Sequence, residues 1–589
     1  MSNTLFMHPA AFFIVGAALL PVLSRLKLLK PALILIPVLA ILQIQQLPET
    51  FGQVNYMGFD LVFGRVDKLT HVFLHVFTLM ALIGCCYGLH VTDPGQHMAA
   101  FLYVGGSLGV TLAGDYLTLF IFWELMAFAS VFLVWYRKKK AAIQAGYRYL
   151  LVHTAGGLVL LMGIFLKYQA THDLSFVLIS PAGATLADYL IMTGFMLNAA
   201  VPPIHAWLPD AYPEATVTGA VFMCAFTTKT AVYVLARAFP GFEALAILGA
   251  VMTLYGVAYA VIENDARRIL AYHIVSQVGY MVCGVGIGTA MAVNGACAHA
   301  YAHIIYKALL FMGAGAVLEM TGKSKLSELG GLWKSMPYAM IFTVIGGISI
   351  SGFPLTSGFI SKSMIIAAAG EAHRTGLMVM LLLASVGTFL SVGIKLPYFI
   401  WFGKDSGVQA TDAPWNMNVG MSIAAFVCIF LGVYPEYLYK MLPFPVAYHP
   451  YTSYHLSETF QILGCTGLVF FLMVKKLAPN EHDKMNLDLD WFYRKGARVF
   501  MWIAKKPLTA VNDWIGEVYR TIGLRLTKAV AAALSWFDKE GIDYLIDGAA
   551  AEVINGGEQV RQLQTGKIQQ YIGGAILIIF LVLTGIVFF

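Results

Sequence analysis

The segment from Thr193 to Arg237 reads TGFMLNAAVPPIHAWLPDAYPEATVTGAVFMCAFTTKTAVYVLAR, a broken apolar helix followed by a second apolar helix that contains a lysine. Proline removes a backbone donor and clashes with the preceding turn, so the first helix must break or end at Pro202 and Pro203. Lys229 lies in the middle of the second helix. A lysine at bilayer depth costs about 2.5–3.5 kcal/mol, so it usually faces a partner or a water-filled path. A broken helix beside a buried lysine indicates a structure that moves charge across a membrane.

The composition is that of a polytopic membrane protein. Of the 589 residues, 59% are hydrophobic and only 12% are charged, whereas about a quarter are charged in soluble proteins. Apolar runs of about 20 residues, the length of a transmembrane helix, recur along almost the whole chain. The first run, Leu5–Leu23, lacks a basic segment before it and is expected to be a retained span. The net charge of +6 is spread over loops and tail, which argues against nucleic acid as a partner.

The seven cysteines fall mostly inside apolar runs. They form no C-x-x-C pair and no spacing that suits zinc or an iron–sulfur cluster. We therefore expect no catalytic residue, no metal site and no cofactor, and no redox or hydrolytic chemistry by this chain alone. A redox centre would belong to a partner subunit, and whether the chain serves a proton-translocating oxidoreductase stays open. His71 and His75 leave histidine-ligated haem as an alternative.

About fifteen expected spans precede the tail, and two of them are interrupted. The second interruption lies at Ser351–Pro354. Two proline-interrupted helices five spans apart are typical of an inverted repeat, in which Lys229 corresponds to Lys395 and Asn198 corresponds roughly to Lys362. The basic links at 25–30 and 137–140 fall on one side of the membrane, which the positive-inside rule makes cytoplasmic. The N-terminus is then expected outside.

The tail after Lys475 mixes aromatic, basic and acidic residues at helical spacing, which suits a helix at the membrane interface. Four glycines and Pro507 argue against one uninterrupted helix there. The expected organisation is N-terminal transmembrane helices at 1–97, two half-channel repeats at 98–262 and 263–403, C-terminal core helices at 404–475, an amphipathic lateral segment at 476–567 and a terminal anchor at 568–589.

Several ionisable residues fall inside the expected spans. Glu124 lies in the middle of the fifth span, where a carboxylate needs a cation nearby unless it is neutral. His299, His303 and Lys307 are spaced i, i+4, i+8, which stacks them on one helical face, and such a stripe can pass protons near neutral pH. The competing interpretation is static ion pairs and hydrogen-bonded packing histidines. The expected proton or ion pathway comprises Glu124, Lys229, His273, His299, His303, Lys307, Lys362 and Lys395.

The motifs around these residues resemble the antiporter-like subunits of respiratory complex I and the D and A subunits of Mrp-type sodium/proton antiporters. They are FWELM around Glu124, PPIHAWLPDAYPEA at 202–215, TTKTAVYVLAR at 227–237, DARRILAYHIVSQVGYM at 265–281, HAYAHIIYKALLFMGAG at 299–315 and GFPLTSGFISKS at 352–363. The core resembles the Mrp D subunit. The stretch RQLQTG at 561–566 resembles the end of the largest complex I subunit of this kind.

The resemblance implies an all-α polytopic fold with a core of about fourteen helices, two inverted five-helix repeats and discontinuous helices. A lateral amphipathic segment and a final transmembrane anchor follow this core. In the family, the residue matching Glu124 pairs with a lysine before the first break, and Asn198 stands at that lysine's position. Either Lys229 takes over as the partner of Glu124, or the first half-channel is altered. Lys307 matches the central residue and Lys362 the terminal one.

The leading hypothesis is therefore a multi-pass subunit of the cell (inner) membrane that translocates protons or monovalent cations within a multisubunit complex. Its expected partners are other membrane subunits, met partly through the lateral segment, together with the lipid bilayer and transported H⁺, Na⁺ or K⁺. The alternative is a mainly structural subunit that straps its neighbours together. The sequence leaves open which cation moves, in which direction, and which complex drives it.

Overall fold

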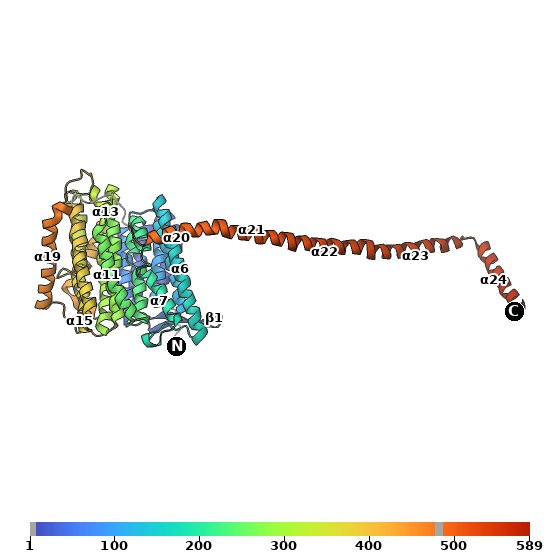
Figure 1. Ribbon diagram of the computed structural model, residues 1–589, viewed down its shortest axis with the longest axis horizontal. Helices are drawn as coiled ribbons and strands as arrows, with labels where there is room; N and C mark the ends of the chain where they lie inside the picture. Colours follow the sequence, from blue (N-terminus) through green and yellow to red (C-terminus); the bar gives the residue numbers. More distant parts are fainter. Residues whose placement is uncertain (1–7, 478–486, 589) are drawn as a thin grey trace. The chain divides into compact units, whose positions relative to one another are not determined.

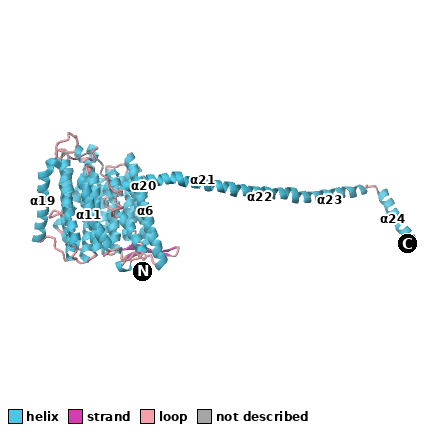
Figure 2. Ribbon diagram, in the orientation of Figure 1, coloured by secondary structure: helices cyan, strands magenta, loops and turns pink. Residues whose placement is uncertain are grey.

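The structure is a computed structural model that describes residues 8–477 and 487–588. It divides into two compact units, Met1–Asp490 and Trp491–Phe589, and helices dominate both (Figure 2). The start of the expected span Leu5–Leu23 and part of the expected lateral segment 476–567 lie outside the described residues.

The first unit opens with two helices, a β-hairpin and a third helix. The hairpin lies between the second and third expected spans, where the sequence indicates only a polar loop. The hairpin strands pair antiparallel from Thr50 with Arg65 to Tyr56 with Phe59. Met57 and Gly58 both have positive φ, 51° and 86°, as a two-residue hairpin turn of the favoured twist requires. The elements are α1 (Pro9–Arg25), α2 (Leu29–Ile44), β1 (Thr50–Tyr56), β2 (Phe59–Arg65) and α3 (Lys68–Tyr87).

The next elements contain the first predicted break, which the structure confirms. Helix α7 ends at Asn198, and helical structure resumes only at Trp207. The predicted second apolar helix is also interrupted, just before Lys229. The elements are α4 (Pro94–Leu112), α5 (Tyr116–Trp135), α6 (Lys140–Thr171), η1 (Pro181–Gly183), α7 (Leu186–Asn198), α8 (Trp207–Ala211), η2 (Tyr212–Glu214), α9 (Val217–Met223) and α10 (Thr227–Ala238).

The second predicted break is also present, between α14 and α15. Pro354 follows a left-handed Gly352, φ 77°, that ends α14. The elements are α11 (Glu243–Ile262), α12 (Ala266–Ile287), α13 (Ala290–Thr321), η3 (Leu326–Glu328), α14 (Pro337–Ser351), α15 (Ser357–Glu371), α16 (Thr375–Thr388) and the π-helical turns η4 (Phe389–Lys395) and η5 (Tyr398–Phe402).

The first unit closes with α17 (Trp415–Val433), α18 (Pro435–Tyr439) and α19 (Ser453–Leu477). Its long helices run roughly parallel (Figure 1). Across the described chain, eleven helices are long and apolar enough to cross a membrane, and three more are apolar but shorter. The 18-residue apolar stretches of the α9–α10 span and of α12 are entirely buried. Lys229, Arg237 and Arg267 of these helices therefore lie inside the protein and do not face lipid.

The second unit is helical from its start to Leu563, so the prediction that glycines and Pro507 interrupt it is wrong. Pro507, Gly523 and Gly541 each lie in a π-helical turn, whereas the other two glycines lie in regular α-helix. A π-helical turn can accommodate a residue that does not make the regular helical hydrogen bond. Each glycine costs a helix only about 1 kcal/mol. The elements are α20 (Asp490–Ile503), η7 (Ala504–Leu508), α21 (Thr509–Val518), η8 (Tyr519–Leu524), α22 (Arg525–Trp536), η9 (Phe537–Asp543), α23 (Tyr544–Leu563) and α24 (Ile568–Phe588).

A bidentate ion pair ties α10 to the start of α3. Arg237 donates from Nη1 and Nη2 to the two carboxylate oxygens of Asp67, each at 2.8 Å. Asp67 also caps α3 by accepting from the Thr70 backbone N–H at 2.8 Å. Burial alone would raise the pKa of Asp67, but the hydrogen bonds and charge of Arg237 outweigh burial and lower it to about 2.

We expect Asp67→Asn to lower the melting midpoint of the detergent-solubilised protein. The pKa of Asp67 is lower in the folded chain than the roughly 3.9 of an unfolded one, so its stabilisation is present above about pH 4 and fades as the pH falls toward 2. Melting curves at several pH values should show a constant gap between variant and wild type above pH 5 that narrows below pH 4. A gap that widens on acidification would contradict this account.

Candidate functional site

Lys229 lies at the interruption between α9 and α10 and is fully buried. Its Nζ donates to the backbone carbonyl of Cys224 at 2.7 Å and to Thr228 Oγ1 at 3.0 Å. The carbonyls of the last turn of a helix have no partner within the helix, and they carry the negative end of its dipole. The break in the span thus creates the acceptor that holds the Lys229 ammonium.

Lys362 is held in the same way by the second break. Its Nζ donates to the carbonyl of Ile350 at 2.8 Å. In a continuous helix that carbonyl would accept from residue 354, but Pro354 has no N–H to give. The proline therefore both ends α14 and leaves an acceptor for Lys362.

Lys395 caps a third helix end. Its Nζ donates at 2.8 Å to the carbonyls of both Val261 and Glu263, at the C-terminus of α11. This position separates Lys395 from the cluster of the other predicted pathway residues. The link nearest to it is Ser391, whose hydroxyl lies 2.7 Å from His273 Nε2.

The predicted stripe on α13 lies in the protein interior, since His299, His303 and Lys307 are all fully buried. Lys307 Nζ has no hydrogen-bond partner within the described chain and lies 5.9 Å from the ring centroid of Phe311. His303 lies within electrostatic range of Lys229, Lys307 and His273. The structure therefore brings residues of α10, α12 and α13 into one buried cluster.

Neutral polar side chains that the sequence analysis did not single out connect this cluster to Lys362. His299 lies 3.2 Å from Gln277 Oε1 through Nε2 and 3.1 Å from Ser361 Oγ through Nδ1. Gln277 donates to Thr388 Oγ1 at 3.3 Å. Gln277 is one turn after His273 on α12, and Ser361 precedes Lys362. The sequence signal for both is a polar side chain four residues or one residue away from a predicted pathway residue.

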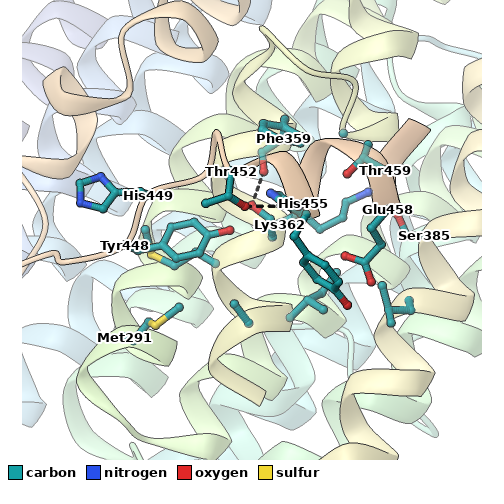
Figure 3. Close-up of a pocket in the computed structure, with 18 of the residues that line it drawn as sticks. Met291, Phe359, Lys362, Ser385, Tyr448, His449, Thr452, His455, Glu458 and Thr459 are labelled. Atoms are coloured by element: carbon teal, nitrogen blue, oxygen red, sulfur yellow. Dashed lines mark hydrogen bonds between the residues drawn. The ribbon is translucent and has the colours of Figure 1, made fainter. Parts of the chain in front are cut away.

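A cavity of about 730 Å³ opens beside Lys362. It lies between α13, α15, α16, the connection before α19 and α19 itself. Figure 3 shows Lys362 at this cavity together with Tyr448, His455 and Glu458. Glu371 and His449 also line it, so polar and titratable groups continue outward from the end of the buried cluster.

Glu124 and Asn198 lie apart from this cluster, and the pairing of Glu124 with Lys229 is not seen. Lys229 is occupied by Cys224 and Thr228. Glu124 instead lies against α6, where its Oε1 sits so close to Gly157 that a Cβ there would collide with it. Glu124 Oε1 and Asn198 Nδ2 are both buried without a hydrogen-bond partner in the described chain.

The loop of the first break is fixed by Asp488, a residue that the sequence analysis did not consider. His205 Nε2 lies 3.3 Å from Asp488 Oδ1, and Tyr272 donates to Asp488 Oδ2 at 2.8 Å. Tyr255 donates to the same carboxylate. Burial alone would raise the pKa of Asp488, but these partners outweigh it and lower the pKa to about 2.

The buried cluster around Lys229, Lys307 and Lys362 is rich in cations and poor in anions. Among the described residues, none of Lys229, Lys307 and Lys362 forms an ion pair. Charges in such a low-dielectric interior repel each other strongly over several ångströms. Protonation of one lysine therefore opposes protonation of the next, and the cluster is suited to passing a proton along.

A family model, several relatives and several solved structures are similar to this chain. Residues 113–391 match a family model described as the transmembrane region of NADH:quinone oxidoreductase and Mrp antiporters. The D-type protein of the Na(+)/H(+) antiporter of Alkalihalophilus pseudofirmus is 30% identical over 362 residues, which cover 58% of this chain and 73% of that protein. The chain belongs to the NADH:quinone oxidoreductase/Mrp antiporter family.

Other members of the family extend the likeness along the chain. The chloroplast NAD(P)H-quinone oxidoreductase subunit 5 of Chara vulgaris is 25% identical over 575 residues, 88% of this chain and 85% of that protein. A chain of the Mrp complex from a Dietzia species matches with a TM-score of 0.67 at 22% identity, over 79% of this chain and 99% of that chain. The predicted resemblance and the helical, polytopic membrane fold are thereby confirmed.

We expect Gln277→Leu to lower the free energy of unfolding by about 1–3 kcal/mol, because it removes the buried hydrogen bonds that Gln277 makes with His299 and Thr388. Thermal unfolding of the purified protein in detergent measures the change. Ser276→Ala is the matched control, since the Ser276 hydroxyl is buried next door and has no partner to lose. Equal stability of the two variants would show that the Gln277 contacts contribute nothing.

Proposed function

We propose that this chain translocates protons, or exchanges protons for a monovalent cation, as one membrane subunit of a larger complex. The observation that carries the proposal is the buried series that runs from Lys229 through the α13 stripe and Gln277 to Lys362 and its cavity. Isolated structural lysines would have no reason to share one interior region of the protein without carboxylates beside them.

The proposed transfer depends on charge repulsion between neighbouring sites. A proton that arrives at Lys229 creates an ammonium within range of His303 and Lys307. Repulsion then favours release of a proton farther along, through the histidines and Gln277 to Lys362. The cavity beside Lys362 supplies the access route to one face of the membrane, and Glu458 and Glu371 favour cations there.

Proteins similar to this chain support its place in an assembly. The relatives include the antiporter protein of Alkalihalophilus pseudofirmus and quinone oxidoreductase subunit 5 of Chara vulgaris, and the structural match is a chain of an Mrp complex. The helices α20 to α23 are amphipathic and present exposed apolar and aromatic residues such as Trp514 and Trp536. We propose that they contact neighbouring membrane subunits.

Lys307→Ala should abolish translocation while the complex stays assembled. In membrane vesicles that contain the whole complex, we expect the pH gradient driven by added Na⁺ or K⁺ to form at least tenfold more slowly than in wild type. Lys404→Ala, at an exposed loop lysine, is the control and should keep the wild-type rate. Wild-type rates in Lys307→Ala would refute the proposed function.

The competing function is a structural subunit, and the exposed amphipathic helices of the second unit are the observation that favours it. Ending the chain after Lys475 tests this possibility. Under our proposal the truncated chain loses neighbouring subunits on purification, whereas full-length Lys307→Ala keeps them but does not translocate. Loss of transport in the truncation alone, with Lys307→Ala fully active, would establish the structural role.

A further inference from the structure

Helices α6 and α13 occupy equivalent positions in two similar stretches of the chain. Each has 32 residues, and α13 begins and ends 150 residues after α6. The helix before each starts at an aspartate cap, Asp115 or Asp265, and that aspartate forms an isolated bridge to a residue after the helix, Ser175 or Lys325. The same offset of 150 residues relates both bridges.

This offset aligns His153 of α6 with His303 of α13, the histidine at the centre of the buried cluster. The two residues share their environment as well as their register. His153 is only 2% exposed, His303 is fully buried, and neither ring nitrogen of either residue has a hydrogen-bond partner in the described chain. The sequence analysis did not select His153, because it took proton-relay histidines only from the stretch 273–303.

The ring of His153 is fixed from two sides. Its centroid lies 4.1 Å from that of Tyr149 and 4.5 Å from that of Trp207. Trp207 is itself anchored by donating to the Leu197 carbonyl at 3.0 Å. Packing therefore holds the imidazole in place and leaves both nitrogens available to a proton.

Glu124 and Asn198 lie next to this histidine. Gly157 follows His153 by one helical turn, about 5.4 Å along the axis, and the Glu124 carboxylate packs on Gly157. Asn198 lies beside the His153 side chain. Three neighbouring helices thus contribute a carboxylate oxygen, an imidazole and an amide nitrogen, all buried and all without a partner among the described residues. A water molecule readily bridges polar groups at such spacing.

Two other titratable groups on α6 beside His153, Arg148 and Tyr149, are already engaged. Arg148, on the same helix, donates to both carboxylate oxygens of Asp210 at 2.7 and 2.9 Å. The Tyr149 hydroxyl lies 2.9 Å from Ser130 Oγ. Glu124 is therefore the carboxylate near His153 that has no cation of its own.

We propose that His153 is the proton-carrying base of the first half and exchanges a proton with Glu124, a role that rests on the proposed translocation. A proton taken up by the imidazole gives an imidazolium paired with the Glu124 carboxylate. Its transfer breaks the ring N–H bond and forms a carboxyl O–H bond, which leaves both groups neutral. The Asn198 amide donates to the oxygen of the bridging water and so orients His153 and Glu124 for the transfer.

The test compares His153→Gln with His153→Gln/Asn198→Lys in the whole complex in membrane vesicles. Gln keeps size and polarity but takes up no proton, so cation-driven formation of the pH gradient should slow at least tenfold. Lysine at 198 restores a protonatable group beside the empty position, so the double variant should recover at least a third of the rate. Because lysine holds its proton to higher pH than histidine, the alkaline limb of its pH–rate profile should move upward. His172→Gln, at the exposed end of α6, is the matched control.

The outcomes separate this proposal from the function on which it rests. If Lys307→Ala abolishes transport but His153→Gln keeps the wild-type rate and pH profile, the role of His153 is overturned and translocation stands. If neither variant changes transport, translocation itself fails. A third outcome is a slow rate that is explained by a smaller amount of assembled complex. If Asn198→Lys then neither restores the rate nor moves the pH profile, His153 is only a packing residue.

Discussion

The structure depends on backbone carbonyls that interrupted helices leave free inside the membrane. Lys229 and Lys362 donate to carbonyls at the C-terminal ends of the interrupted elements α9 and α14. Lys395 donates in the same way at the C-terminus of α11, which is not interrupted. A buried ammonium costs much free energy unless it is hydrogen-bonded, and an orphan carbonyl in hydrocarbon is also costly. The hydrogen bond between the ammonium and the carbonyl removes both costs, so each break stabilises its lysine and each lysine stabilises its break.

This solution places cations in the interior without carboxylates to neutralise them. A carbonyl stabilises an ammonium through a dipole, which also accepts hydrogen bonds from neutral donors and so does not demand a fixed charge. A carboxylate partner would hold each lysine protonated at all times. Glu124, which lies apart from these lysines, is by contrast a carboxylate without a bound cation among the described residues. The lysine cluster and the surroundings of Glu124 therefore differ in the sign of the buried charge.

Much of this arrangement can be predicted from residue types. Proline marks both breaks, and the i, i+4, i+8 spacing correctly places His299, His303 and Lys307 on one buried face. The acceptors of the lysines cannot be predicted, because they are backbone atoms that every residue has. Glycines in the second unit give a false signal of interruption, since two lie in π-helical turns and two are tolerated within regular α-helix. The hairpin is missed because it lies in a polar stretch, where turn chemistry at Met57 and Gly58 is the main clue.

Lys307 differs from the other three lysines in one respect, the lack of any carbonyl to hold its ammonium in the described chain. Its four-carbon stem has many rotamers, and changing between them breaks no hydrogen bond. Hydrogen bonds hold the ammonium groups of Lys229 and Lys362 in place, whereas the Lys307 ammonium can move between rotamers at little enthalpic cost. The rate of proton transfer along the series would then be set by how strongly Lys229 and Lys362 hold their protons, and not by the motion of the Lys307 side chain.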